Sequence, residues 1–131
     1  MPQDKPAILC VDDEENPLIL RRLVLENAGY EVVTASSAEQ AFAVLSTRHI
    51  DLVLSDHLMP GPTGTELARQ IKAVWPSLPV ILLSGVNDIP VEAHCADLFL
   101  SKVEGPATLC ESIAEVLADH ESRRKQDSLP I

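Results

Sequence analysis

The chain has 131 residues, the usual size of one domain, and its 20 acidic side chains against 10 lysines and arginines give a formal net charge of −10. Hydrophobic residues make up 46% and charged residues 23%, a globular composition that excludes wholesale disorder and collagen-like repeats. The negative charge disfavours direct DNA binding by this chain, and no apolar run approaches the ~18 residues that a membrane span needs.

Five short apolar runs predict β-strands. Four of the five are almost continuously aliphatic, which is typical of strands buried on both faces of a parallel sheet rather than of an antiparallel sheet with one wet face. In chain order these strands are predicted at residues 7–11, 31–35, 52–54, 80–83 and 98–100.

Stretches of helical period separate the strands, and they carry start and stop signals. Asn16 is expected to cap the first helix, with Pro17 at its first position and Gly29 at its end. The fourth helix has room for only a short piece near residues 90–95, and Gly105-Pro106 opens the last helix. Capping boxes are predicted from Ser36 with Glu39 and from Thr63 with Glu66.

The spacing of apolar residues assigns an inner face to each long helix. Beyond the last of these faces, residues 121–131 have too few apolar side chains to pack, so we expect a helix end that runs into a polar, disordered C-terminal tail. The inner faces are assigned to Leu20, Leu23 and Val24; to Ala41, Val44 and Leu45; to Leu67, Ile71 and Val74; and to Leu109, Ile113, Val116 and Leu117.

Alternating strands and helices predict an α/β fold with a parallel sheet covered on both sides. Ligands of such sheets bind outside the carboxyl ends of the strands, so the residues that follow each strand are the candidates for a site. They are Asp12 and Asp13 after the first strand, Asp56 after the third, Ser84 after the fourth and Lys102 after the fifth.

These residue types suit phosphoryl transfer. Clustered carboxylates resist ionising together unless a cation lies between them, and oxygen ligands favour Mg²⁺ that shares its coordination with a phosphoryl group. Lysine and serine supply a charge and a hydrogen bond to such a group. Asp56 is the best candidate for a carboxylate that accepts the phosphoryl group, because its strand is expected at the centre of the sheet.

The same residues closely resemble the receiver domain of bacterial response regulators over residues 7–118. Asp12-Asp13 resembles the acidic pair of that family, and the segment 56–61, with Gly64 beyond, resembles the phosphoacceptor segment. Ser84 matches the family's Ser/Thr, Lys102 its lysine, and Phe99 the aromatic residue that serves as a rotamer switch. The resemblance implies a flavodoxin-like (βα)5 sheet in the order 2-1-3-4-5, and makes residues 1–120 the receiver domain.

Carried over residue by residue, the resemblance implies a function in two-component or phosphorelay signalling. Asp56 would take a phosphoryl group from a phosphohistidine on a sensor histidine kinase or a histidine phosphotransfer protein. Asp13 and Asp56 would hold Mg²⁺ with the backbone carbonyl of Leu58, and Asp12 would act largely through water. Lys102 and Ser84 would hold the phosphoryl oxygens, and Phe99 would turn inward to switch a protein-interaction surface. Such a chain catalyses only its own phosphorylation and dephosphorylation, and its downstream protein target stays open.

The sequence departs from the family pattern on its fourth and fifth elements. Val103 replaces the usual proline after the lysine, Gly85 follows Ser84, and Cys95 stands where glycine is usual. With Cys10 and Cys110 it forms neither a disulfide framework nor a zinc pattern, so we expect a protein of the reducing cytoplasm.

Several alternatives stay open beside a stand-alone receiver. The chain can be a receiver excised from a longer regulator or hybrid kinase, or a receiver-like module that binds partners without phosphorylation. An aspartyl phosphatase is disfavoured because Leu58 stands where its second aspartate is usual. A flavin mononucleotide binder is disfavoured because residues 12–15 are all acidic and would repel phosphate.

Overall fold

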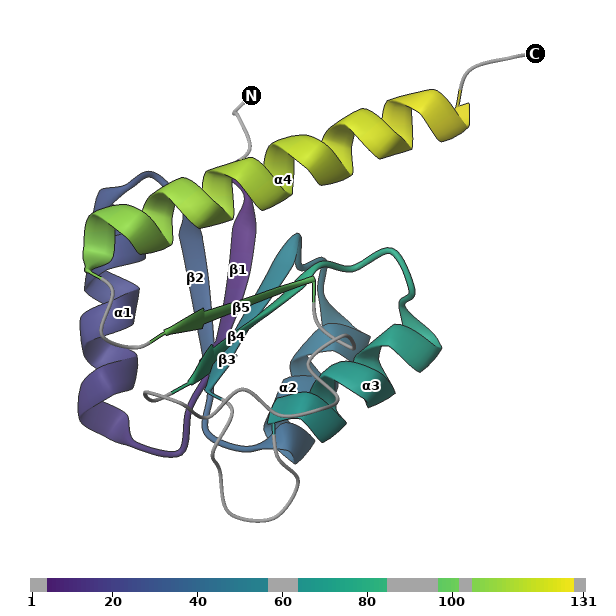
Figure 1. Cartoon of the computed structure of the whole chain (residues 1–131). Coiled ribbons are helices and arrows are strands. Elements are labelled where there is room, and N and C mark those ends of the chain that lie inside the picture. The colour runs from purple at the N-terminus through teal and green to yellow at the C-terminus, as the bar shows by residue number, and fades with distance from the viewer. Residues whose placement is uncertain (1–4, 57–63, 85–96, 102–104, 129–131) are drawn as a thin grey trace.

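The computed structural model describes residues 5–56, 64–84, 97–101 and 105–128. Within these ranges, five parallel strands form one sheet in the order β2-β1-β3-β4-β5 (Figure 1). The predicted fold class and strand order are confirmed, while the short helix predicted near residues 90–95 lies outside the described residues. The elements are β1 (Ala7–Val11), α1 (Glu15–Asn27), β2 (Glu31–Ala35), α2 (Ala38–Thr47), β3 (Leu52–Asp56), α3 (Gly64–Val74), β4 (Val80–Ser84), β5 (Leu98–Ser101) and α4 (Pro106–Ser128).

The sheet has an apolar layer on each face, because successive side chains of a strand point to opposite sides. β1 and β3 are buried at every residue, as the continuous apolar runs predicted. Leu9 and Val53 pack with the inner residues of α2 and α3, whereas Ile8 and Leu54 pack with those of α1 and α4. The two pairs of helices lie on opposite sides of the sheet in Figure 1.

Helix α1 begins earlier than the sequence analysis predicted. The cap position belongs to Glu14, in extended conformation and without a side-chain capping bond, rather than to Asn16. The chain turns directly after β1 because the Asp12 carboxylate accepts a hydrogen bond from the Glu14 backbone N–H (3.0 Å). Pro17 therefore occupies the third helical position, where its missing N–H breaks no bond within the helix. Gly29 follows the helix with φ of 101°, as the predicted end requires.

The predicted inner face of α1 was also wrong. Leu20 and Leu23 are 64% and 59% exposed, whereas Leu18 and Leu25 are buried and Val24 is half-buried. The earlier start of the helix changes which of its many apolar side chains face the sheet. Leu18, Arg21 and Leu25 share the inner stripe at positions i, i+3 and i+7.

The other helices follow their predicted patterns with local differences. The capping box of α2 is shifted by one residue: Ser37 Oγ accepts from the Gln40 backbone N–H (3.1 Å), and the Gln40 side chain accepts from the Ser36 N–H (2.9 Å). Thr63 of the other predicted capping box lies outside the described residues. On α3, Val74 is 58% exposed because it is the last residue of the helix, beyond the buried Leu67 and Ile71.

Helix α4 opens at Pro106, as predicted, and continues to Ser128. The structure places residues 121–128 in this helix, where the sequence analysis expected a disordered tail. The segment contains good helix formers such as Glu, Arg, Lys and Gln, and no Gly or Pro interrupts it. The placement of the domain boundary at residue 120 stays a prediction.

Two aspartates tie the amino ends of neighbouring strands together. Asp51, just before β3, accepts from the Ala7 N–H (2.8 Å) and donates its own N–H to the Ala7 carbonyl (2.8 Å). Asp97, just before β5, does the same with Val80 (2.7 and 2.8 Å) and is paired with Lys72 (2.7 Å). Strand-opening N–H groups that have no strand partner are satisfied in this way.

The structure predicts different costs for two leucine substitutions on α1. Leu25→Ala removes a fully buried side chain and should lower the free energy of unfolding by about 2–5 kcal/mol. The matched control Leu23→Ala, on the exposed side of the same helix, should change it by about 0.5 kcal/mol or less. Urea unfolding followed by circular dichroism measures both, and equal losses would contradict the observed face of the helix.

Candidate functional site

The carboxyl ends of β1 and β3 lie side by side at one edge of the sheet. In their parallel pairing, Val11 lies opposite Ser55, so the next residues along the two chains, Asp12 and Asp56, are neighbours. The Asp12 backbone N–H donates to the carbonyl of Ala35 at the end of β2 (3.1 Å), which keeps this residue at the sheet edge. The two aspartates are thus placed by the backbone of three adjacent strands.

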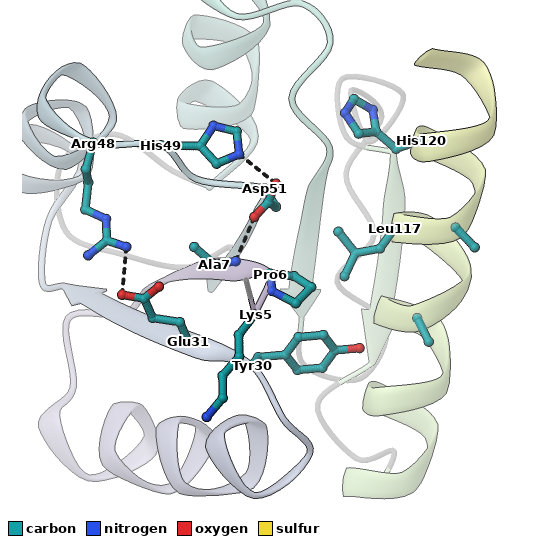
Figure 2. Close-up of a pocket in the computed structure, with 12 residues that line it drawn as sticks. Lys5, Pro6, Ala7, Tyr30, Glu31, Arg48, His49, Asp51, Leu117 and His120 are labelled. Carbon is teal, nitrogen blue, oxygen red and sulfur yellow. Dashed lines mark hydrogen bonds and ion pairs between the residues drawn. The ribbon is translucent and has the colours of Figure 1, made fainter. Parts of the chain in front are cut away.

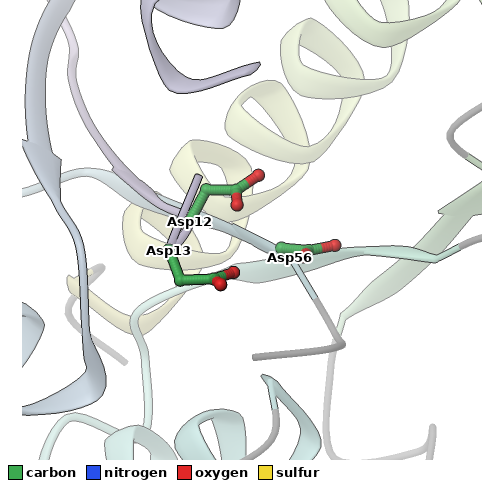
Figure 3. A group of neighbouring side chains, drawn as sticks. All are labelled: Asp12, Asp13 and Asp56. Carbon is green, nitrogen blue, oxygen red and sulfur yellow. The ribbon is translucent and has the colours of Figure 1, made fainter. Parts of the chain in front are cut away.

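Three carboxylates converge at this edge, as the sequence predicted. Asp12, Asp13 and Asp56 each offer an oxygen, and these oxygens lie within 4.8 Å of one another (Figure 3). Asp12 and Asp56 are 1% and 2% exposed, whereas Asp13 is exposed to solvent. Two carboxylates of the cluster are therefore buried, and the third, that of Asp13, is open to solvent.

The donor set fits a hard divalent cation. Negative charges at this separation repel one another, and two of the three have lost most of their contact with water, so positive charge between them is favoured. Carboxylate oxygens are the ligands that Mg²⁺ and Ca²⁺ prefer, and Mg²⁺ in particular uses few protein carboxylates together with water or phosphate. Asp12, Asp13 and Asp56 are the residues that could hold it.

A fourth member of the site was missed by the sequence analysis. Arg21 reaches from α1 and its Nη1 donates to Asp12 Oδ2 at 2.7 Å, with the arginine side chain 13% exposed. The signal that could have revealed it is its spacing, because Arg21 lies three residues after Leu18 and four before Leu25, both buried. A basic residue on the inner stripe of a helix needs an anion to face.

The other predicted site residues are described only in part. The backbone of Ser84 ends β4, one residue beyond Leu83, which pairs with Asp56, and it pairs with Ser101 of β5. This register places Ser84 at the same edge as the carboxylates. The side chains of Ser84 and Phe99, and all of Leu58 and Lys102, lie outside the described residues, so their roles stay predictions.

A second hollow lies at the opposite, amino edge of the sheet (Figure 2). It has a volume of about 810 Å³ and lies between the start of β1, the α2–β3 connection and α4. Two pairs of its lining residues are in contact, Arg48 with Glu31 (2.9 Å) and His49 with Asp51 (2.7 Å). Of the predicted site residues, the three aspartates that the structure describes do not line it.

A parallel sheet in this strand order, with acids converging where its first and third strands end, defines the chemotaxis-regulator class of doubly wound proteins. The chain belongs to the response regulator receiver domain family, which matches residues 8–114. It is a receiver domain of two-component systems, a class whose members interact with histidine kinases or phosphotransfer proteins.

Similar proteins include both regulators and a kinase. The chain is 42% identical over 87 residues to the transcriptional regulatory protein GlrR of Escherichia coli (strain K12), covering 66% of this chain and 20% of GlrR. It is 32% identical over 104 residues to the autoinducer 1 sensor kinase/phosphatase LuxN of Vibrio harveyi, covering 79% of this chain and 12% of LuxN. The chain thus spans a fifth or less of the length of these curated relatives. The activity of each full-length relative is a property of that protein.

Among solved structures, the response regulator TrrA of Thermotoga maritima, in complex with Mg(2+)-BeF, is similar with a TM-score of 0.80 and 31% identity. The match covers 85% of this chain and 98% of TrrA. Across the described part of the chain, no helix combines the length and apolar character that crossing a membrane requires.

Cys10 lies in the core two residues before Asp12, and the charges of the site affect the pKa of its thiol. Burial raises the pKa of its thiol to about 12, an effect that the positive charge of Arg21 opposes and the negative charge of Asp12 reinforces. The thiol therefore stays protonated in the folded protein at neutral and mildly alkaline pH. The reactive species of a cysteine is the thiolate, so folding should protect Cys10.

We expect Cys10 to react with a disulfide reagent only after unfolding. In a Cys95→Ser/Cys110→Ser background at about pH 8, absorbance should show negligible labelling of the native protein and rapid labelling in denaturant. A matched variant that retains only the half-buried Cys110 should react in the native state. Equal rates for native and unfolded Cys10 would contradict its burial.

Proposed function

We propose that this receiver accepts a phosphoryl group on Asp56 from the phosphohistidine of a sensor histidine kinase or a histidine phosphotransfer protein. The observation that supports this most directly is the position of Asp56. It ends the central strand β3, is 2% exposed, and has an oxygen within 4.8 Å of those of Asp12 and Asp13. A carboxylate in that position meets an incoming phosphoryl group beside the residues suited to balance its charge.

In the transfer, a carboxylate oxygen of Asp56 attacks phosphorus, a P–O bond forms and the P–N bond to the donor histidine breaks. The imidazole leaves with the electron pair of that bond and takes a proton. The product is an aspartyl phosphate. Lys102 and Ser84 are proposed to hold the phosphoryl oxygens, and Phe99 to turn inward as Ser84 is drawn toward the phosphate.

The site is proposed to be Mg²⁺-dependent, with Asp13, Asp56 and the backbone carbonyl of Leu58 as ligands and Asp12 acting through water. When bound, the cation would neutralise charge that accumulates between the carboxylates and the phosphoryl oxygens. The structure of TrrA with Mg(2+)-BeF is consistent with such a site in a similar protein. The chain's own residues supply the acceptor and the positive charge of Lys102.

The output is proposed to be a change of protein contacts rather than turnover of an external substrate. The net charge of −10 argues against direct DNA contact by this chain. The identity of the downstream protein stays open. GlrR is a transcriptional regulatory protein and LuxN a sensor kinase, so receivers similar to this one are parts of both kinds of protein. A stand-alone receiver and a receiver excised from a longer protein are both compatible with this function.

The proposal is tested by intact mass after incubation with Mg²⁺ and acetyl phosphate. We expect the protein to gain one phosphoryl group, Asp56→Asn to gain none, and chelation of Mg²⁺ to abolish the gain. Asp119→Asn, a change at an exposed aspartate of α4, is the matched control and should be phosphorylated like the natural sequence.

A gain of equal size in Asp56→Asn would overturn the assignment of the acceptor. No gain with several donors, in folded protein that still binds Mg²⁺, would favour a receiver that binds partners without phosphorylation.

A further inference from the structure

We propose that Arg21 is a built-in competitor of Mg²⁺: it neutralises Asp12 in the metal-free protein and thereby lowers the affinity of the three-carboxylate site for the cation. This inference rests on the proposed function, because it concerns the same site, and it deepens it by naming a residue that sets metal affinity. Arg21 acts here as a positioning residue through Asp12.

The ion pair between Arg21 and Asp12 is short and sheltered. Arg21 Nη1 lies 2.7 Å from Asp12 Oδ2, and the two side chains are 13% and 1% exposed. Arg21 lies on the inner stripe of α1, at a position between the buried Leu18 and Leu25. A pair removed from water in this way is weakly screened by salt, so the positive charge of the guanidinium acts strongly on another charge that comes close to it.

Both oxygens of Asp12 are engaged by the protein itself. Oδ2 accepts from Arg21, and Oδ1 accepts from the backbone N–H of Glu14 at 3.0 Å. A carboxylate whose two oxygens both accept hydrogen bonds has fewer lone pairs available for direct coordination of a metal ion. The geometry therefore favours direct ligation through Asp13 and Asp56, with Asp12 contributing charge.

Like charge gives the direction of the effect. A cation that enters among the three carboxylates, whose oxygens lie within 4.8 Å of each other, approaches the guanidinium paired with Asp12, and the two positive charges repel. Without Mg²⁺, the same arginine reduces the repulsion among the carboxylates and so stabilises the metal-free folded protein. Removing its charge should therefore weaken the fold and strengthen metal binding at the same time.

The next residue offers a matched control. Arg22 carries the same charge on the same helix, but it pairs with Glu26 at 3.1 Å on the surface, with side chains 54% and 42% exposed. An exposed pair of this kind contributes little, and solvent screens its field at the site. Arg22→Gln thus reproduces the change in net charge without touching Asp12.

The test is a calorimetric titration of the whole chain with Mg²⁺ for the natural sequence, R21Q, R22Q and R21K, joined to thermal unfolding with and without Mg²⁺. We expect R21Q to bind Mg²⁺ about tenfold more tightly than the natural sequence. R22Q and R21K should stay within about twofold of it, because each keeps a positive charge at position 21. Without Mg²⁺, R21Q should melt at a lower temperature than R22Q, and Mg²⁺ should raise its melting temperature more.

A merely structural role for Arg21 would lower stability without tightening Mg²⁺ binding, and that result would overturn the inference alone. R21K binding as tightly as R21Q would overturn it too, since the charge would then not be the cause. If R21Q is unfolded without Mg²⁺, saturating Mg²⁺ should fold it, and failure to do so would count against the inference. No Mg²⁺ binding by any variant would overturn the proposed Mg²⁺ site, and with it this inference.

Discussion

The parallel pairing of β1 with β3 is the interaction on which the site depends. With Val11 opposite Ser55, the acids that follow these two strands become neighbours at the sheet edge. A slip of one residue in this register would turn one of them to the other face of the sheet. The register is held by burial, because every residue of both strands is buried and the apolar ones pack into the two layers of the core. The hydrophobic core and the carboxylate cluster are thus two consequences of the same alignment.

The two edges of the sheet use aspartate for different purposes. At the amino edge, strands begin with N–H groups that have no strand partner, and Asp51 and Asp97 accept from those of Ala7 and Val80. At the carboxyl edge, the strands end in carbonyl groups, which cannot donate to a carboxylate. Asp12 therefore takes its donors from the following turn and from Arg21. Acids at this edge are left close to one another, which is the condition for binding a cation.

Most of the fold could be predicted from local patterns. The five apolar runs were long enough, and interrupted clearly enough, to predict the strands, and Ile113 and Leu67 were recognised as inner residues of their helices. Helix α1 differed most from the prediction, because its own apolar side chains occur on most of its sides and their period is ambiguous. A hydrogen bond between Asp12 and the Glu14 N–H decides where that helix starts, and this contact depends on the geometry of the turn after β1. The same helix carries Arg21, a site residue that the sequence pattern did not reveal.

By itself, the sequence determined the class of fold and the chemistry available at one edge of the sheet. Apolar runs of strand length require burial on both faces, and the residue types that follow them are carboxylates, a hydroxyl and a lysine whatever the packing. Only the tertiary structure decided which leucines of α1 are buried and that Arg21 meets Asp12 at 2.7 Å. Asp12 and Arg21 are nine positions apart, the first directly after β1 and the second on α1. Their contact depends on how α1 is rotated and packed against the sheet, which no local pattern specifies.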